Sequence, residues 1–597
     1  MVAVLHGWSA LVRLKFAGRA IFMRFLLPLL LIAVISGCDP GPGDTDIEKA
    51  VADTVLSNGR IYTVDKANPW VDSVAIKDGR YIYVGEAEGA QAYIGAATEF
   101  IDLQGKMAMP GINDIHAHPW QGGLKMLYEC NYSFTAAPAE IAQIIGDCIT
   151  ANPEAQWILG GQWTSDFFQL HGMTSPRQWL DALSADKAMY FQDDATHNAW
   201  VNSKALELAG INKDTADPAG GTIVRDEDGV PNGVLLETAT RLVAAVIPAW
   251  TPEQNVAALD AAVRAANSYG VTGMVEARTP PEVSQAYQQL DQAGRLTAYA
   301  ITDLQTPRGQ RDQPMAVAPL KKVSEQYRSE HVHTRFAKIF LDGVPTASRT
   351  AVMLEPYRVD VDAPEVFRGA ALVSQDALVA DLIALDSNGF TVKIHTAGDG
   401  AVRLALDAIE QVRETNGRSG LRHELAHAGY IHADDLPRFA ALNVTVDLSP
   451  AIWYPRPIFD SIEGAIGDRA RYYFPIKDLL ASGANLATGS DWPSVAGSID
   501  PWHALEAMVT RRNPYDDSEQ ALWAEQAISL AQAIEIFTLG GAKAYRLESL
   551  TGSIEVGKSA ELLVLNQNLF EVTAESIGDT EVIMTLFEGK LVYGSAP

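Results

Sequence analysis

The chain has 597 residues, which is more than one ordinary hydrophobic core accommodates, although barrel domains often exceed about 250 residues. Hydrophobic residues make up 47% and charged residues 20%, a balance typical of a globular protein and not of a disordered one. The formal net charge of −28 argues against nucleic acid as a partner and against charge-driven adhesion to anionic lipid.

The N-terminus has the form of an export signal. Arg24 precedes the apolar run F-L-L-P-L-L-L-I-A-V-I-S-G-C, which is too short for a comfortable membrane span and resembles a signal peptide. Ile35-Ser36-Gly37-Cys38 looks like a bacterial lipobox, so we expect Cys38 to become the lipidated first residue of an exported, periplasmic lipoprotein anchored to a membrane. Met23 is an alternative start, and an uncleaved N-terminal anchor is the alternative to cleavage. Residues 1–45 are signal and tether, outside the fold.

Both ends of the remaining chain read as short strands. Residues 46–107 contain Asn58-Gly59 and Asp78-Gly79 between apolar runs, and each pair predicts a β-hairpin. Residues 548–597 show the same style of short apolar runs and glycine-containing turns. We therefore expect one small β-sandwich, built from both ends, beside a central domain at 108–547.

The central domain alternates short apolar runs with helical segments, which predicts an α/β fold with a parallel sheet and crossover helices. Eight such runs are present, the number that closes a (β/α)8 barrel. The runs are the stretch ending in H-A-H at 118, then 270–277, 295–301, 335–343, 391–398, 423–429, 444–450 and 485–493. Residues from about 121 to 252 have no place in a minimal barrel, so we expect an insertion after the first strand, with its own strands near 157–163 and 189–192.

Two cysteines fall within this insertion. A helical pattern from Pro138 to Ile149 would bring Cys148 back over the start of the segment, near Cys130. An exported compartment permits disulfides, so the pair forms either a disulfide or two buried free thiols.

The most informative motif is His116-Ala117-His118, at the end of the first barrel run. Alternate side chains of a strand face the same side, so both imidazoles would project together and hold one metal ion. Pro119 cannot donate to a ladder and is expected to end the strand just past them. Two histidines on a surface strand are the alternative.

Four further polar residues lie near the C-terminal ends of other barrel runs. They are Lys338, His395, His427 and Asp491. Barrel active sites are built at that end of the strands, and imidazole and carboxylate donors suit an ion of the zinc type. The joint placement predicts a metal centre at the barrel mouth.

Several longer motifs identify the family that the chain resembles. They are P-G-I-N-D-I-H-A-H (110–118), D-A-T-H-N-A-W-V-N-S-K-A-L (194–206), G-G-T-I-V-R-D-E-D-G-V-P-N-G-V-L-L-E (220–237), K-I-F-L-D-G (338–343), H-T-A-G-D-G-A-V (395–402), R-H-E-L-A-H (422–427), G-S-D-W-P (489–493) and T-G-S-I-E-V-G-K-S-A-E-L-L-V-L (551–565). Over residues 51–597 the chain is similar to the YtcJ-like group of type 3 amidohydrolases, which includes N-substituted formamide deformylases. Glu561 departs from the aspartate usual at its position.

The resemblance implies a metal-dependent hydrolase of small molecules with amide-like, non-peptide carbon–nitrogen bonds. The residues it assigns to a centre of one or two Zn²⁺ ions, or another divalent metal, are His116, His118, Lys338, His395, His427 and Asp491. The H-x-H pair and the aspartate hold the first ion, the other two histidines hold the second, and the lysine, carboxylated on its amine, bridges them. A metal-activated hydroxide would attack the carbonyl, and the aspartate would carry the proton to the leaving nitrogen.

Other site residues have two interpretations each. His197 contacts the scissile carbonyl or the substrate, or serves the structure; Glu237 lies beside the metal or forms a salt bridge within the insertion. Trp163, Trp453 and Trp492 line an apolar substrate pocket or pack in the core. Fold and metal do not separate amide hydrolysis from ester, lactone or phosphoester hydrolysis, or from a non-catalytic regulatory protein that retains the fold. The sequence leaves monomer and oligomer both open.

Overall fold

The computed structural model describes residues 50–133, 136–164, 167–193, 198–218, 221–359, 366–454, 456–494, 497–516 and 520–597. The predicted signal peptide with Cys38, and His197, lie outside these ranges. Within them, no helix combines the length and apolar character that crossing a membrane requires.

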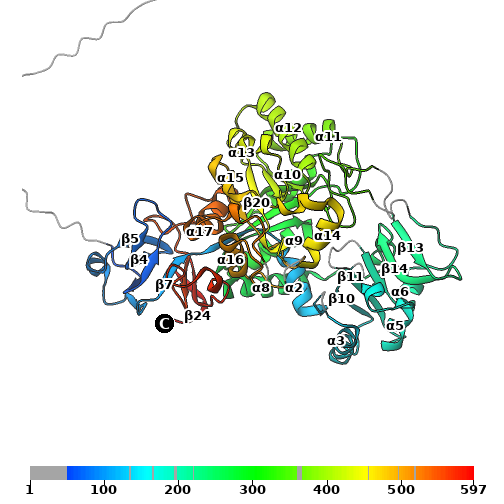
Figure 1. The fold of residues 1–597 in the computed structure, drawn as a ribbon. Helices are drawn as coiled ribbons and strands as arrows, with labels where there is room; N and C mark the ends of the chain where they lie inside the picture. Colours follow the sequence, from blue (N-terminus) through cyan, green and yellow to red (C-terminus); the bar gives the residue numbers. More distant parts are fainter. Residues whose placement is uncertain are drawn as a thin grey trace, which may run out of the picture. The chain divides into compact units, whose positions relative to one another are not determined.

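Eight parallel strands form the centre of the molecule (Figure 1). They are β8 (Ile112–Ala117), β15 (Val271–Thr279), β16 (Tyr299–Gln305), β17 (Val332–Phe340), β18 (Thr391–Thr396), β19 (Glu424–His427), β20 (Thr445–Leu448) and β21 (Asn485–Thr488), hydrogen-bonded in that order. Each neighbouring pair is parallel, for example Ala337 with Val392 and Val446 with Leu486. The predicted (β/α)8 barrel is confirmed, with β8 and β21 facing each other at a seam.

Helices cover the outside of the barrel because each presents an apolar stripe to the strands. The main ones are α8 (Pro252–Ser268), α9 (Pro281–Gln292), α10 (Ala318–Tyr327), α11 (Gln375–Ser387), α12 (Asp399–Asn416), α13 (Leu436–Leu442), α14 (Arg456–Ile466), α15 (Ile476–Ala481), α16 (Trp502–Thr510), α17 (Leu530–Glu535) and α18 (Gly541–Tyr545). In α12, Val402, Leu406, Ile409 and Val412 recur at helical spacing and are all buried. The burial of each such side chain stabilises the fold by roughly 1.5–3 kcal/mol.

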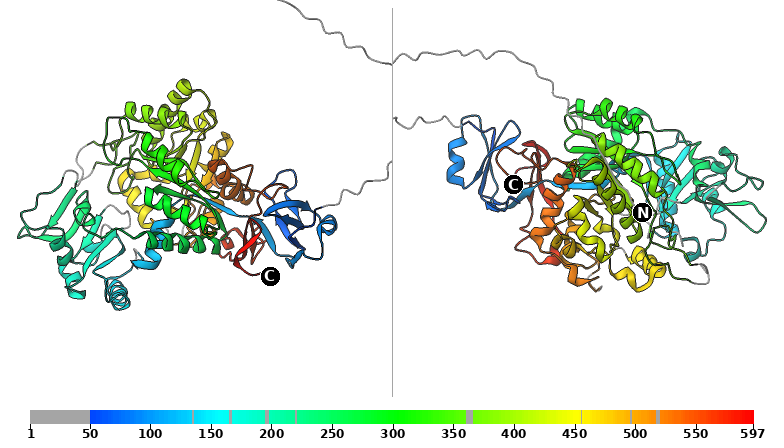
Figure 2. Two further views of the ribbon diagram at one scale, coloured as in Figure 1. Left: turned by 180° about the vertical axis from the view of Figure 1, so that it is seen from behind. Right: turned by 90° about the horizontal axis from the view of Figure 1, so that it is seen from above.

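The two chain ends combine beside the barrel. Their strands are β1 (Thr54–Ser57), β2 (Arg60–Tyr62), β3 (Trp70–Val71), β4 (Ser73–Lys77), β5 (Arg80–Gly85), β6 (Glu99–Asp102), β7 (Met107–Pro110), β22 (Leu562–Leu565), β23 (Val582–Phe587) and β24 (Lys590–Gly594). One sheet has the order β5-β4-β1-β6 and the other β24-β23-β22-β7-β2-β3. The antiparallel pairing of β22 with β7 joins the C-terminal strands to the N-terminal ones, which lie side by side in both views of Figure 2.

One hairpin expectation is wrong. Asp78-Gly79 does connect the paired strands β4 and β5, but Asn58-Gly59 does not join a hairpin. Both edges of β1 are occupied, by β4 and by β6, so the chain crosses at Asn58 to the other sheet, where β2 pairs with β7. Asn58 still adopts the left-handed conformation that the turn signal indicates.

The insertion after β8 forms a sheet of its own. Following α2 (Pro119–Tyr128), its strands are β9 (Cys130–Asn131), β10 (Trp157–Trp163), β11 (Ala188–Asp193), β12 (Asn198–Val201), β13 (Gly221–Arg225) and β14 (Pro231–Glu237), in the order β13-β14-β12-β11-β10-β9. Its helices are α3 (Pro138–Ala151), α4 (Phe167–Leu170), α5 (Pro176–Leu183), α6 (Ser203–Leu208) and α7 (Thr240–Ala244). Cys130 and Cys148 form a disulfide, with Cα atoms 6.0 Å apart.

Candidate metal centre

The two histidines of the opening motif lie where β8 becomes α2. His116 is inside the strand and 1% exposed, whereas His118 is the residue between the strand and the helix that starts at Pro119. The expectation that both lie within one strand therefore holds only for His116. Their rings nevertheless face one region, with centroids 5.9 Å apart.

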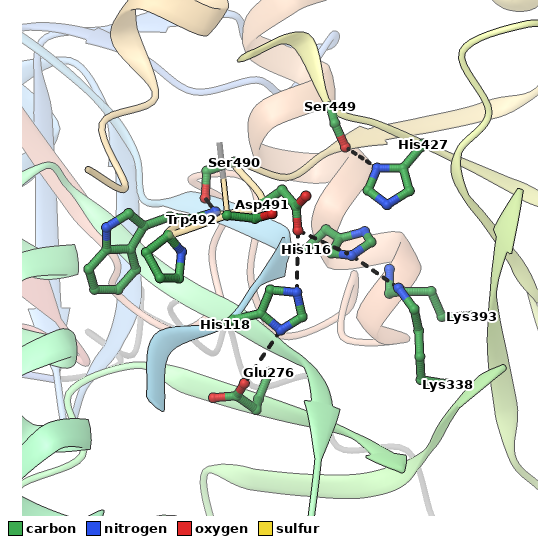
Figure 3. Close-up of polar contacts among 12 residues, drawn as sticks. His116, His118, Glu276, Lys338, Lys393, His427, Ser449, Ser490, Asp491 and Trp492 are labelled. Carbon is green, nitrogen blue, oxygen red and sulfur yellow. Dashed lines mark hydrogen bonds and ion pairs between the residues drawn. The ribbon is translucent and has the colours of Figure 1, made fainter. Parts of the chain in front are cut away.

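Asp491 reaches the same region across the barrel seam (Figure 3). Its backbone N–H donates to the His116 carbonyl (2.7 Å), and the His118 N–H donates to the Trp492 carbonyl (2.7 Å). A β-carbon on Gly489 would overlap His116, so the close approach of the two segments requires glycine there. Asp491 itself has φ +54°, a strained conformation of the kind that clusters at functional sites.

These three side chains offer a donor set for a cation. Asp491 Oδ1 lies 3.3 Å from His118 Nε2 and 3.7 Å from His116 Nε2, and one donor atom from each residue lies within 4.8 Å of the others. Burial lowers the pKa of both imidazoles, so each is neutral and keeps a lone pair. Although burial opposes it, the neighbouring imidazoles of His118, His116 and His427 hold the pKa of Asp491 well below its usual range. Two neutral imidazoles and one carboxylate fit an ion of the zinc type.

The other three predicted ligands adjoin this cluster. Lys338 Nζ is 3.0 Å from His116 Nε2, the His427 ring centroid is 4.6 Å from that of His116, and the His395 centroid is 4.7 Å from that of His427. Burial, together with the charge of Lys393, lowers the pKa of Lys338 to about 8. Burial and His395 lower the pKa of His427 to about 3. The six residues thus meet in one region, with the tightest donor set on the Asp491 side.

Three of the four imidazoles in the centre have a hydrogen-bond partner at Nδ1, and the fourth, that of His118, has only a more distant carboxylate. His116 Nδ1 lies 2.6 Å from Asp447 Oδ2, and His395 Nδ1 lies 2.9 Å from Asp342 Oδ1. His427 Nδ1 lies 3.1 Å from Ser449 Oγ. His118 Nδ1 is 3.8 Å from Glu276 Oε1. Such partners fix the ring and leave Nε2 for a metal, which is the usual arrangement around ligating histidines.

The sequence reasoning missed three of these partners. They are Glu276, Asp447 and Ser449. The available signal was a polar residue inside an otherwise apolar strand, as in G-M-V-E-A and V-T-V-D-L-S. Glu276 also accepts hydrogen bonds from the Trp120 N–H (2.8 Å) and the Tyr287 hydroxyl (3.4 Å), and burial raises its pKa to about 8.

Below the histidines, the barrel interior holds a network of buried charges. Lys393 donates to Glu424 and to Asp447 Oδ2 (2.9 Å), the oxygen that also meets His116. All of these side chains are almost fully buried. The Lys393 ammonium group therefore links β18 to Glu424 of β19 and to Asp447 of β20, the carboxylate that orients His116.

The three tryptophans are buried, which is compatible with core packing and with the lining of a pocket. Trp163 is in the core of the insertion and donates to the Phe191 carbonyl (3.0 Å). Trp453 packs beneath the Arg511 guanidinium, 4.7 Å away, and borders a cavity of about 360 Å³. Trp492 packs against Gly122 of α2.

The insertion contacts the loop that carries Asp491. Gln162 Nε2 donates to the carbonyls of Pro493 (3.2 Å) and Ser494 (2.7 Å). Glu237 ends β14 in an exposed position with φ +52°, and it is outside the compact donor cluster. Its charge opposes the lowering of the Arg308 pKa, so the two side chains are close enough to interact.

Barrel, flanking sheets and donor cluster together give this chain the fold of the metal-dependent amidohydrolase barrels. The chain belongs to the Amidohydrolase family, whose pattern matches residues 99–593. The resemblance inferred from the motifs is confirmed.

Relatives extend over nearly the whole chain. Protein LONG AFTER FAR-RED 3 of Arabidopsis thaliana is 29% identical over 98% of this chain and 100% of its own. The putative amidohydrolase YtcJ of Bacillus subtilis is 27% identical (90% and 99% covered), and the N-substituted formamide deformylase of Arthrobacter pascens is 25% identical (91% and 98%). Among solved structures, an uncharacterized metal-dependent hydrolase from Pyrococcus horikoshii matches with TM-score 0.70, 25% identity and coverage of 87% and 99%.

Proposed function

We propose that this chain is a metal-dependent hydrolase of non-peptide carbon–nitrogen bonds in small, amide-like molecules. The observation that carries the proposal is the set of two neutral imidazoles and one carboxylate within 4.8 Å at the barrel mouth. The similarity to a protein named N-substituted formamide deformylase supports the choice of a C–N bond.

The residues that would hold metal fall into two groups. His116, His118 and Asp491 would bind one ion, and His395 and His427 a second. When bound there, a divalent ion of the zinc type would lower the pKa of a water molecule and polarise a carbonyl oxygen.

Lys338 would join the two groups as a carbamate. Its lowered pKa leaves part of the amine neutral near pH 7, the form that reacts with carbon dioxide. The ammonium first loses one proton; the neutral nitrogen then forms a bond to the carbon of carbon dioxide, one carbon–oxygen π bond breaks, and the nitrogen loses a second proton, so that the side chain changes from a cation to an anion with release of two protons.

Asp491 would move the proton. Its carboxylate is ionised at neutral pH, lies 3.3 Å from His118 Nε2, and is fixed by its backbone bond to His116. It would accept a proton from the attacking water and deliver it to the leaving nitrogen. Asp447, Asp342 and Ser449 would hold the rings of His116, His395 and His427 in place during this transfer.

The test combines metal analysis with a substrate panel. Purified protein is assayed for bound metal by plasma mass spectrometry, and for hydrolysis of an N-substituted formamide, an N-acyl amine, a carbamate, an ester, a lactone and a phosphoester. We expect about one or two divalent ions per chain and turnover of a C–N substrate. His116→Ala should lose metal and activity together, while His432→Ala, an exposed histidine of the same barrel, should keep both.

Each other outcome overturns a part of the proposal. Turnover of esters, lactones or phosphoesters alone would assign another bond to the same centre. Full metal content without any hydrolysis would favour a regulatory protein that retains the fold. Full metal content in His116→Ala would refute the ligand assignment.

We also propose that the chain is exported and lipidated on Cys38. The apolar run that ends in Ile35-Ser36-Gly37-Cys38 supports this. Mass spectrometry of the native N-terminus should find a lipid-modified Cys38, and an unmodified chain that retains residues 24–37 would refute it.

A further inference from the structure

Arginines of this acidic protein are commonly paired with carboxylates. Arg311 pairs with Asp381, Arg413 with Asp386 and Arg403 with Asp435. Two arginines at the rim of the barrel, Arg278 and Arg308, differ: within the described part of the chain, neither guanidinium forms an ion pair.

Arg278 lies near the C-terminal end of β15, two residues after Glu276. Burial lowers the pKa of Arg278, and the nearby Glu276 carboxylate opposes this shift. Glu276 Oε1 in turn lies 3.8 Å from His118 Nδ1. The Arg278 Nε–H donates to Gln305 Oε1 (3.2 Å), which ends β16.

Arg308 approaches the centre from the next strand. It follows the end of β16 by three residues, and its guanidinium carbon is 4.3 Å from the centre of the Phe340 ring. Phe340 ends β17 and stacks on the His395 ring, with centroids 5.8 Å apart. Lys338 Nζ lies 5.3 Å from the centre of the Phe340 ring. Arg308, Lys338 and His395 thus all lie around one aromatic ring.

The surroundings of Arg308 disfavour its positive charge. Burial, Arg278 and then Arg241 of the insertion lower the pKa of Arg308 to about 10, and Glu237 opposes them. A shared positive region without an ion-paired carboxylate is unfavourable in the free protein, and a bound anion would relieve the repulsion.

We propose that Arg278 and Arg308 form a subsite that recognises an anionic group, a carboxylate or a phosphate, on the substrate of the candidate metal centre. The proposal rests on the proposed function and narrows its substrate class. With a net charge of −28 the protein as a whole repels anions, so capture of an anionic substrate requires a local positive site at the mouth. Guanidinium groups match carboxylate and phosphate geometry and bind both in bidentate fashion.

Another arginine stacked on phenylalanine has its guanidinium satisfied by protein groups. Arg335 stacks on Phe390 at 5.2 Å, much as Arg308 stacks on Phe340. Arg335, however, also pairs with Glu325 (3.4 Å) and donates to the Asn388 carbonyl (3.3 Å). Stacking on phenylalanine therefore does not require an unpaired guanidinium, and Arg335 supplies a matched control.

The first experiment compares three N-substituted formamides that differ in one group. The substituent carries a carboxylate, a phosphonate or a carboxamide at the same position, and formate release is measured with the metal-loaded protein. We expect kcat/KM for an anionic compound to exceed that for the carboxamide, and the larger of the two anionic values identifies the group. Arg308→Gln and Arg278→Gln should each lower kcat/KM for the preferred anion by about 10- to 100-fold, mainly through KM, and leave the carboxamide nearly unchanged. Arg335→Gln should change neither.

The second experiment does not depend on turnover. The affinities of succinate and inorganic phosphate are measured by calorimetry for the wild type and the same variants. A loss of affinity in Arg278→Gln and Arg308→Gln alone, without formamide hydrolysis by any protein, would keep the anion subsite and refute the proposed function. Hydrolysis without preference for an anionic substituent, or equal losses for charged and neutral compounds, would refute the subsite and keep the function.

Discussion

Charged side chains in the interior of the barrel are paired with one another, whereas two arginines at its rim form no ion pair within the described residues. In the interior, Lys393, Glu424 and Asp447 are buried and hydrogen-bonded to one another, and Asp447 also orients His116. At the rim, Arg278 and Arg308 carry charge that no carboxylate of the described residues pairs. Charges paired within the protein serve its structure and hold side chains in position, whereas unpaired charges beside a site remain available to a ligand.

The pKa directions express the same contrast. Burial alone would lower the pKa of Lys393, but Asp447 and Glu424 outweigh it and raise the pKa above its ordinary value. For Arg308 burial and neighbouring guanidiniums act together, and the pKa falls to about 10. The interior network stabilises the charged state of its lysine, while the rim destabilises the charge of its arginine until an anion binds.

The largest expected effect is on turnover, and it should come from Asp491, the carboxylate of the donor cluster. Asp491→Asn keeps the shape and one oxygen donor but removes the proton acceptor, so most metal should remain while kcat falls by about 10²- to 10⁴-fold. Metal content and kcat of the same preparation test this. Asp434→Asn, a change on the exposed surface, is the control.

One result would contradict the role in proton transfer, and another would contradict the expectation that metal remains bound. Turnover close to that of the wild type would remove Asp491 from proton transfer. Complete loss of metal in Asp491→Asn would show that metal binding requires the Asp491 carboxylate, and proton transfer would then need another test.

Breaking the interior network should affect stability more than any surface change. Lys393→Met leaves Glu424 and Asp447 buried without their cation, and we expect a loss of about 3–5 kcal/mol in the free energy of unfolding. Urea unfolding at pH 7 measures it. Lys66→Met, which removes an exposed pair with Glu535, should cost less than about 1 kcal/mol. Equal effects of the two changes would refute the distinction between interior and surface pairs.

A milder change tests whether the interior network of Lys393, Glu424 and Asp447 supports metal binding. Asp447→Asn removes the charge that faces His116 Nδ1 at 2.6 Å but keeps a hydrogen-bond acceptor. We expect metal affinity to fall by about 10- to 100-fold, the usual effect of removing an orienting partner. Competition with a chelator measures the affinity, with Asp434→Asn again as the control. Unchanged affinity would mean that His116 is oriented without Asp447.

The sequence predicted most of the barrel and the residues at its mouth. Eight apolar runs at crossover spacing indicated the strands, and polar residues near their ends indicated the side chains that meet there. The same reasoning could not find the partners of those side chains. His116 and Asp447 are 331 residues apart, and their contact exists only because β8 and β20 face one interior. The hairpin predicted at Asn58 was wrong for a related reason, because a turn signal specifies the local backbone conformation and not which strand lies opposite.

The smallest predicted effect concerns a paired charge far from the centre. His331 joins the barrel to the chain-end sheets: its Nδ1 lies 2.6 Å from Asp291 Oδ1 and its Nε2 3.2 Å from Glu588 Oε1. Burial opposes the charged ring, but the two carboxylates outweigh it and raise the pKa of His331 to about 10, from an ordinary value of 6.5. A raised pKa in the folded state stabilises the fold fully below pH about 6.5, and this contribution is lost as pH rises toward 10. His331→Gln should therefore lower the free energy of unfolding by about 1–3 kcal/mol at pH 6, with a difference from the wild type that shrinks steadily up to pH 10. Urea unfolding at intervals between pH 6 and 10 measures the difference, and the exposed His432→Gln provides the comparison. A difference that stays constant over this range would show that the His331 ring contributes by packing and not by its charge.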